Sequence, residues 1–80
     1  MGSKTSEVVH AGFTTALDYD TNGNLIYFGK AGRGASKAAA VWNIVRLTYD
    51  ANSQLTDMQW ADGNALFDNV WDDRAGLSYS

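Results

Sequence analysis

Glycine and basic residues are interspersed between positions 29 and 37, where Gly29, Gly32 and Gly34 surround Lys30 and Arg33. Glycine-rich loops with a lysine bind phosphate when they have the spacing G-x-x-x-x-G-K-[ST], or the spacing G-x-G-x-x-G inside a parallel βαβ unit. Neither spacing occurs here, and 80 residues are too few to build that sheet around the loop. The pattern therefore favours a flexible basic loop, with Lys30 and Arg33 touching the acidic surface of a partner.

Alternating oxygen-bearing side chains occur at Asp20, Asn22 and Asn24, as in loops that bind calcium. The glycine of this segment stands at the fourth loop position instead of the sixth, and Ala31 occupies the place of the bidentate glutamate. A type I′ hairpin turn explains the segment better, because Asn-Gly is the favoured pair where both central residues need positive φ.

Groups suited to catalysis are few. The absence of cysteine excludes disulfides, thiolate zinc sites and cysteine nucleophiles. The single histidine, His10, is interpreted as a structural or surface residue. Acid–base hydrolysis needs two carboxyl groups held about 5–9 Å apart across a cleft, whereas Asp62, Asp68, Asp72 and Asp73 fit a solvated face. We therefore expect no enzyme activity, no metal and no cofactor.

Three tryptophans, Trp42, Trp60 and Trp71, are many for a chain of this length. Tryptophan anchors cores and protein interfaces, and it is also a platform for sugars or stacked bases. Base stacking would need a basic groove, which this sequence does not offer. The tryptophans favour core and subunit contacts, and an exposed Trp42 or Trp60 would instead indicate a carbohydrate-binding module.

Apolar and polar residues alternate through residues 9–19, with the period of a half-buried strand. The turn at Asn22-Gly23 then leads into a returning strand over residues 25–28. The expected pairs are Leu17 with Phe28 and Tyr19 with Ile26. The glycine-rich residues 29–37 are expected to form a loop.

A second hairpin follows, with a β-branched and aromatic strand over residues 41–49 and a returning strand over 55–61. Large apolar groups lie on both faces of the first of these strands, as in a central strand or a subunit contact. Residues 19–25 and 49–55 share Tyr, Asp, Asn and Leu at the same offsets. Recurring turn chemistry explains this likeness, and so does a duplicated unit.

The period changes near the C-terminus, where four apolar residues fall on one face of a short helix: Leu66, Phe67, Val70 and Trp71. Asn64 suits the N-cap and Gly76 suits the helix end. A helix of about two turns does not stand alone, so its face must pack on the sheet or on a neighbour. Residues 77–80 suit a final short strand.

The expected fold is mainly β, with two successive antiparallel hairpins forming a small sheet or sandwich and one short C-terminal helix. Residues 1–7 are expected to be a flexible N-terminal tail, and residues 8–80 a single domain. Met1 to Ser6 matches the acylation pattern M-G-x-x-x-[ST], and it matches a plain tail equally well. No apolar run approaches the ~20 residues of a membrane helix, and no signal peptide is visible.

Size and charge together indicate assembly. A chain of 80 residues buries only about 60–65% of its unfolded surface, so association with other copies is the expected further source of stability. The net charge of −3 argues against general nucleic-acid binding. Residues 1–40 carry four basic and three acidic side chains, and residues 41–80 carry two basic and six acidic ones. Copies could therefore meet plus-end to minus-end, unless the charges are merely scattered.

Four segments resemble small virion-associated structural proteins of tailed bacteriophages: residues 27–31, 40–44, 60–64 and 67–79. The most specific part reads W-A-D-G-N followed by F-D-N-V-W-D-D-R. The resemblance implies a capsid-decoration or tail-fibre component, located in the virion and in the host cytoplasm during assembly, with major capsid or tail proteins as partners.

We therefore expect a non-enzymatic homo-oligomer with neither membrane nor nucleic acid as partner. The alternatives are an acidic phage inhibitor of a host nucleic-acid enzyme and a carbohydrate-binding module of a tail fibre. The candidate contact residues are Trp42, Trp60, Leu66, Phe67, Val70, Trp71, Lys30, Arg33, Asp72 and Asp73.

Overall fold

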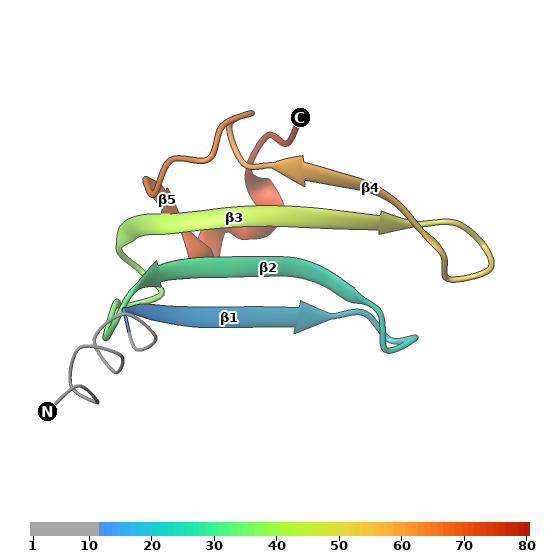
Figure 1. The fold of residues 1–80 in the computed structure, drawn as a ribbon, viewed down its shortest axis with the longest axis horizontal. Coiled ribbons are helices and arrows are strands. Elements are labelled where there is room, and N and C mark those ends of the chain that lie inside the picture. The colour runs from blue at the N-terminus through green and yellow to red at the C-terminus, as the bar shows by residue number, and fades with distance from the viewer. Residues whose placement is uncertain (1–11) are drawn as a thin grey trace, which may run out of the picture.

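An antiparallel sheet dominates the computed structural model, which describes residues 12–80. Its first four strands follow one another as neighbours (Figure 1): β1 (Phe13–Tyr19), β2 (Leu25–Gly32), β3 (Ala40–Tyr49) and β4 (Leu55–Trp60). A short β5 (Asn69–Val70) pairs with the start of β3 and leads into the 3₁₀ helix η1 (Trp71–Gly76). The expected mainly β fold with two hairpins and a short C-terminal helix is confirmed. The expected tail over residues 1–7, and His10, lie outside the described residues.

The two hairpin turns have the same construction. In the first turn, the Asp20 carboxylate accepts the backbone N–H groups of Asn22 and Asn24, both at 2.9 Å. In the second, the Asp50 carboxylate accepts those of Asn52 and Gln54 at 2.9 and 3.0 Å. The likeness between residues 19–25 and 49–55 is therefore a repeat of turn structure.

The predicted turn type is wrong. Positive φ occurs at Gly23 (83°) but not at Asn22, so the turn is not of type I′, which needs it at both positions. Leu17 pairs with Phe28 as expected, but Tyr19 pairs with Leu25 because a bulge shifts the register after Asp18. The same shift occurs between Thr48 and Tyr49 in the second hairpin.

β2 is four residues longer than expected, and the predicted loop begins only after Gly32. The reason is packing: Gly29 lies directly beneath the Trp71 ring, where a Cβ would be 2.5 Å from Cε3 of the indole. Ala31, two residues on, is completely buried in the same core. These small residues leave room for the indole rings to pack on the strand. Local secondary-structure propensity does not indicate such a contact between distant segments.

The helix lies later in the chain than expected. Leu66 and Phe67 belong to a loop and are 60% and 45% exposed, whereas Trp71 is buried at the start of η1. Asn64 does not cap a helix; its side chain accepts the N–H of Leu66 at 3.0 Å in a local turn. The predicted start of the helix after Asn64 is thus wrong, while its predicted end at Gly76 is confirmed.

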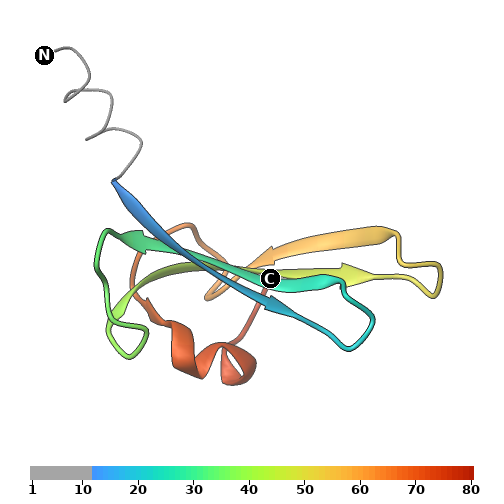
Figure 2. The ribbon, with the colours of Figure 1, turned by 90° about the horizontal axis from the view of Figure 1, so that it is seen from below.

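Among residues 12–80, a second layer lies on only one face of the sheet. Figure 2 shows η1 packed on that face while the other side of the four strands is open over most of its length. The C-terminal segment lies beside β4, where Trp60 and Ser80 exchange backbone hydrogen bonds of 2.9 and 3.1 Å. The predicted final strand is reduced to a single bridge between Ala61 and Tyr79.

Candidate functional site

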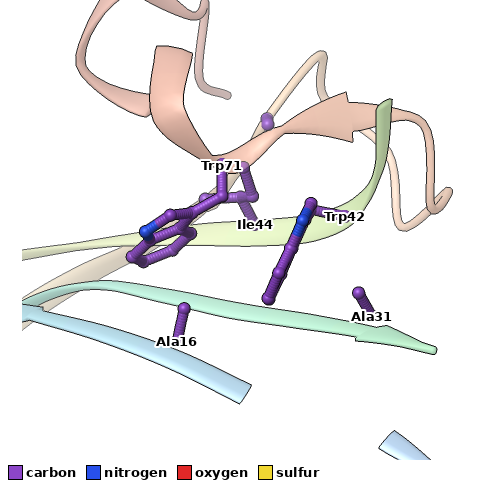
Figure 3. Close-up of a cluster of buried hydrophobic side chains, with 6 residues drawn as sticks. Ala16, Ala31, Trp42, Ile44 and Trp71 are labelled. Carbon is purple, nitrogen blue, oxygen red and sulfur yellow. The ribbon is translucent and has the colours of Figure 1, made fainter. Parts of the chain in front are cut away.

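The core lies on the face that η1 covers, called here the covered face. Ala16, Gly29 and Ile44 form a row across β1, β2 and β3, and the indoles of Trp42 and Trp71 lie over it with ring centroids 5.8 Å apart. Figure 3 shows both rings pointing into the space between the sheet and the C-terminal segment. This small cluster is the main hydrophobic core of the described residues.

Polar contacts fix the positions of the two indole rings. The Trp42 indole N–H donates to the Ser36 carbonyl at 2.9 Å. Arg74 Nε donates to the Asp18 carboxylate at 2.9 Å, and its guanidinium lies 4.6 Å from the Trp71 ring centroid. These contacts make Trp42 and Trp71 internal residues that are 0% and 3% exposed. This corrects the expectation that all three tryptophans contact other chains, and it removes Trp42 as a sugar platform.

The opposite face of the sheet, called here the apolar face, carries the clearest candidate site. A row of apolar residues crosses it with one member from each strand: Leu17, Phe28, Val45 and Trp60. Directly opposed residues of antiparallel strands share a face, so these four side chains stand on the same side. The next row continues the surface, with Leu47 paired to Met58.

Much of the apolar face is exposed. The side chains that remain about half exposed are Phe13 (52%), Leu17 (51%), Tyr19 (55%), Met58 (58%) and Trp60 (38%). At about 200 Å² for each large side chain, the exposed parts of these five residues present about 500 Å². That lies within the ~300–600 Å² of the largest apolar patch on a typical monomer, a patch that is often functional. The surface is one that a partner would be expected to cover.

One end of the apolar face is bordered by the loop before β5. The Phe67 ring stacks on Phe13 at 6.1 Å between centroids, and Lys30 Nζ lies 4.9 Å from the same Phe13 ring. The Asn43 amide donates to the Ala65 carbonyl at 2.6 Å, which fixes this loop to β3. The structure therefore brings three expected contact residues, Phe67, Lys30 and Trp60, to one face.

The remaining contact candidates lie elsewhere. Arg33 is exposed in the loop after β2, Asp72 and Asp73 are exposed on η1, and Val70 is half-buried in β5. The Asp72 N–H donates to the Lys37 carbonyl at 3.1 Å, so the basic loop and the acidic helix are neighbours. The charge difference between the two halves of the sequence therefore does not produce two opposite charged ends at these segments.

Groups that could support catalysis are not gathered in one place in the part of the chain that the structure describes. Within residues 12–80 there is no pocket, and no three acidic or histidine side chains are placed to hold one metal ion. Burial raises the pKa of Tyr79 to about 12, and Tyr27 adds to that shift, whereas Arg46 and Arg74 lower the pKa. The Tyr79 hydroxyl donates to the Arg74 carbonyl at 2.8 Å, so this phenol serves the packing of the C-terminal segment.

Several residues of the apolar face were not selected from the sequence. The alternation predicts that Phe13, Leu17 and Tyr19 share one strand face, and residues 41–49 are apolar on both sides, but neither pattern indicates which face the C-terminal segment covers. One sequence feature could have identified these residues as exposed. The segment after residue 61 is too short to cover both faces of a four-stranded hairpin sheet, so one apolar face must stay open.

Comparison with protein-family models, with curated proteins and with solved structures gives no match. Among the helices of the described residues, none has the length and apolar character needed to cross a membrane.

Proposed function

We propose that this chain is a non-enzymatic structural subunit that works by associating with copies of itself and by docking onto other proteins of a larger particle. The observation that carries the proposal is the row Leu17, Phe28, Val45 and Trp60, which crosses β1, β2, β3 and β4 on the face opposite η1.

The size of the apolar face fits a protein interface. Its exposed apolar surface of about 500 Å² is below the ~800 Å² that each partner contributes to a standard protein–protein interface, and it fits a small interface of less than ~1,200 Å² in total. Lys30 is the one charged side chain that the register places on this face among residues 12–80, and its ammonium group lies against Phe13. Charge depletion with exposed aromatic residues and methionine is typical of an interface centre.

The resemblance of residues 27–31, 40–44, 60–64 and 67–79 to virion-associated proteins supplies the setting. In that setting the chain is a capsid-decoration or tail-fibre component of a tailed bacteriophage, present in many copies and assembled in the host cytoplasm. Major capsid or tail proteins are the proposed further partners. Mass spectrometry of purified particles tests this setting, which requires the chain to be present in the virion.

Sedimentation equilibrium tests self-association. Met58→Glu places a charge on the apolar face, where burial without a partner costs about 3 kcal/mol. We expect the dissociation constant of the assembly to rise at least about 100-fold. Ala75→Glu is the matched control, because Ala75 is exposed on η1, against the other face. A wild-type protein that stays monomeric at high micromolar concentration would refute the proposal.

A carbohydrate-binding module is the second candidate, favoured by the partly exposed Trp60 indole on an open sheet face. This role predicts that millimolar glycans quench tryptophan fluorescence and that Trp60→Ala abolishes the effect. A glycan array with no binding at such concentrations would eliminate it.

A further inference from the structure

We propose that β1 is a second association surface and that it pairs antiparallel with β1 of a second copy, so that the sheets of the two copies join into one continuous sheet. The proposal rests on the self-association proposed above, but it depends on a different part of the molecule. Figure 1 shows β1 at the outer edge of the sheet, with β2 as its single neighbour.

The free backbone groups of β1 can be assigned from the hairpin. Asp20 directs both its N–H and its C=O toward the returning strand, bonding to Asn24 and Gly23 at 2.9 and 3.1 Å. Hydrogen bonding alternates along an antiparallel strand, so the even-numbered residues of β1 bond to β2. The residues with outward N–H and C=O groups are then Phe13, Thr15, Leu17 and Tyr19.

These same four residues have side chains on the apolar face, because alternate side chains of a strand share a face. Pairing along β1 therefore satisfies backbone groups and also extends the apolar face from one copy into the next. Neither effect requires the backbone of β1 to change.

β1 also lacks the features that prevent an edge strand from pairing with a strand of another molecule. Proteins protect such edges with charges, proline, bulges or a covering segment. The charge on β1 at Asp18 is already paired with Arg74 on the covered face, and the strand has seven residues without proline. The extra residue of the first hairpin's bulge belongs to β2 and not to β1.

The opposite edge, β4, shows what protection looks like in this chain. The backbone of Trp60 is bonded to Ser80 in both directions, a bulge interrupts the strand near Thr56, and Asp57 is exposed. The contrast identifies β1 as the edge that is left open among residues 12–80.

A second copy suits this edge because β1 is self-complementary. A two-fold axis at Ala16 places Phe13 opposite Tyr19 of the second copy and Thr15 opposite Leu17 of the second copy. Asp18 then faces Thr14 of the second copy, so no like charges meet. Cross-strand aromatic pairs of this kind stabilise sheets. Two different two-fold contacts, edge and face, would also let the assembly grow beyond a dimer.

Disulfide trapping tests the register, since the chain has no cysteine of its own. Thr15→Cys and Leu17→Cys are prepared as separate proteins. Opposed residues of a hydrogen-bonded pair lie about 5.5 Å apart at Cα, within disulfide range, whereas two copies of position 15 are offset. We expect mixed dimers of the two variants to form at least about tenfold faster than dimers of either alone. Thr15→Cys mixed with Ala51→Cys measures random collision.

Different results would overturn edge pairing through β1 and self-association in general. If wild-type protein assembles but the mixed dimer forms no faster than the collision control, edge pairing is overturned while self-association stands. If wild-type protein is monomeric, both are overturned. Thr15→Pro provides a second test, because it removes an outward N–H of β1. We expect the sedimenting mass to fall to that of a dimer while the far-ultraviolet dichroism spectrum stays unchanged. An unchanged mass would count against pairing along β1.

Discussion

Replacing Gly29 by alanine tests the packing that creates the two unlike faces of the sheet. A Cβ at this position would lie 2.5 and 2.7 Å from Cε3 and Cζ3 of Trp71, and 3.1 Å from Cε3 of Trp42. Ordinary contact begins at 3.4 Å, so the Trp71 ring would have to retreat by about 1 Å. The ring has little room, because it is 3% exposed and Arg74 lies against it.

The expected loss of stability follows from two opposing effects. Overpacking of a core costs about 1–3 kcal/mol, and the close contact with a constrained ring favours the upper end. Alanine in a strand recovers about 0.5–1 kcal/mol of the glycine backbone entropy. We expect the free energy of unfolding to fall by about 2 kcal/mol, and Tm by about 8–16 °C for a domain of this size. Urea unfolding monitored by tryptophan fluorescence measures the difference.

Gly32→Ala is the matched control, because a Cβ at Gly32 meets nothing within 4 Å and that residue ends the same strand. Its free energy of unfolding should rise by about 0.4–1 kcal/mol, because alanine lowers the conformational entropy of the unfolded chain and meets no steric penalty here. In a Trp71→Leu background the penalty of Gly29→Ala should largely disappear, because contacting residues are coupled. Equal stability of Gly29→Ala and Gly32→Ala in the wild-type background would refute the reasoning.

Further predictions concern the turns and the C-terminal segment. Asp20→Ala and Asp50→Ala each leave two backbone N–H groups without their acceptor, so each should lower the free energy of unfolding by about 1 kcal/mol in chemical denaturation; a negligible change in both would contradict the turn assignment. Because the Tyr79 pKa is raised to about 12 in the folded chain, the folded state holds that proton more tightly than the unfolded state, and stability should fall as the pH rises from about 10 to 12. Tyr79→Phe should lessen this fall, and an identical pH profile would count against the assignment.

The two hairpins could be predicted from the sequence because neighbouring residues determine their strands and turns. Alternation over residues 13–19 and the recurring Asp-x-Asn turns specify strands and their connections within a few residues. The pairing of Leu17 with Phe28 follows from these features alone. Bulges shifted the next pair, because the Asp20 carboxylate bonds to the N–H groups of Asn22 and Asn24 and favours a longer turn.

Which face of the sheet is covered could not be predicted in the same way. Gly29 and Ala31 have the composition of a loop, but contact with Trp71 and Trp42 holds them in a strand. Leu66 and Phe67 have helical spacing, yet η1 begins only at Trp71. Each of these outcomes depends on contacts between segments distant in sequence, and the same contacts decide which apolar face remains uncovered.

An intermolecular nuclear Overhauser experiment at Met58 tests the central claim most directly. Met58 is 58% exposed on the apolar face, where β4 carries it next to Leu47, and Met1 is the one other methionine in the chain. Wild-type protein with 13C-labelled methionine methyl groups is mixed with unlabelled protein, and contacts between labelled and unlabelled copies are selected. The proposed packing predicts intermolecular signals from the Met58 methyl group to aromatic protons of the second copy. A Met58 methyl group that shows contacts only within its own chain, at concentrations where the protein sediments as an oligomer, would contradict the assignment of the apolar face as the interface.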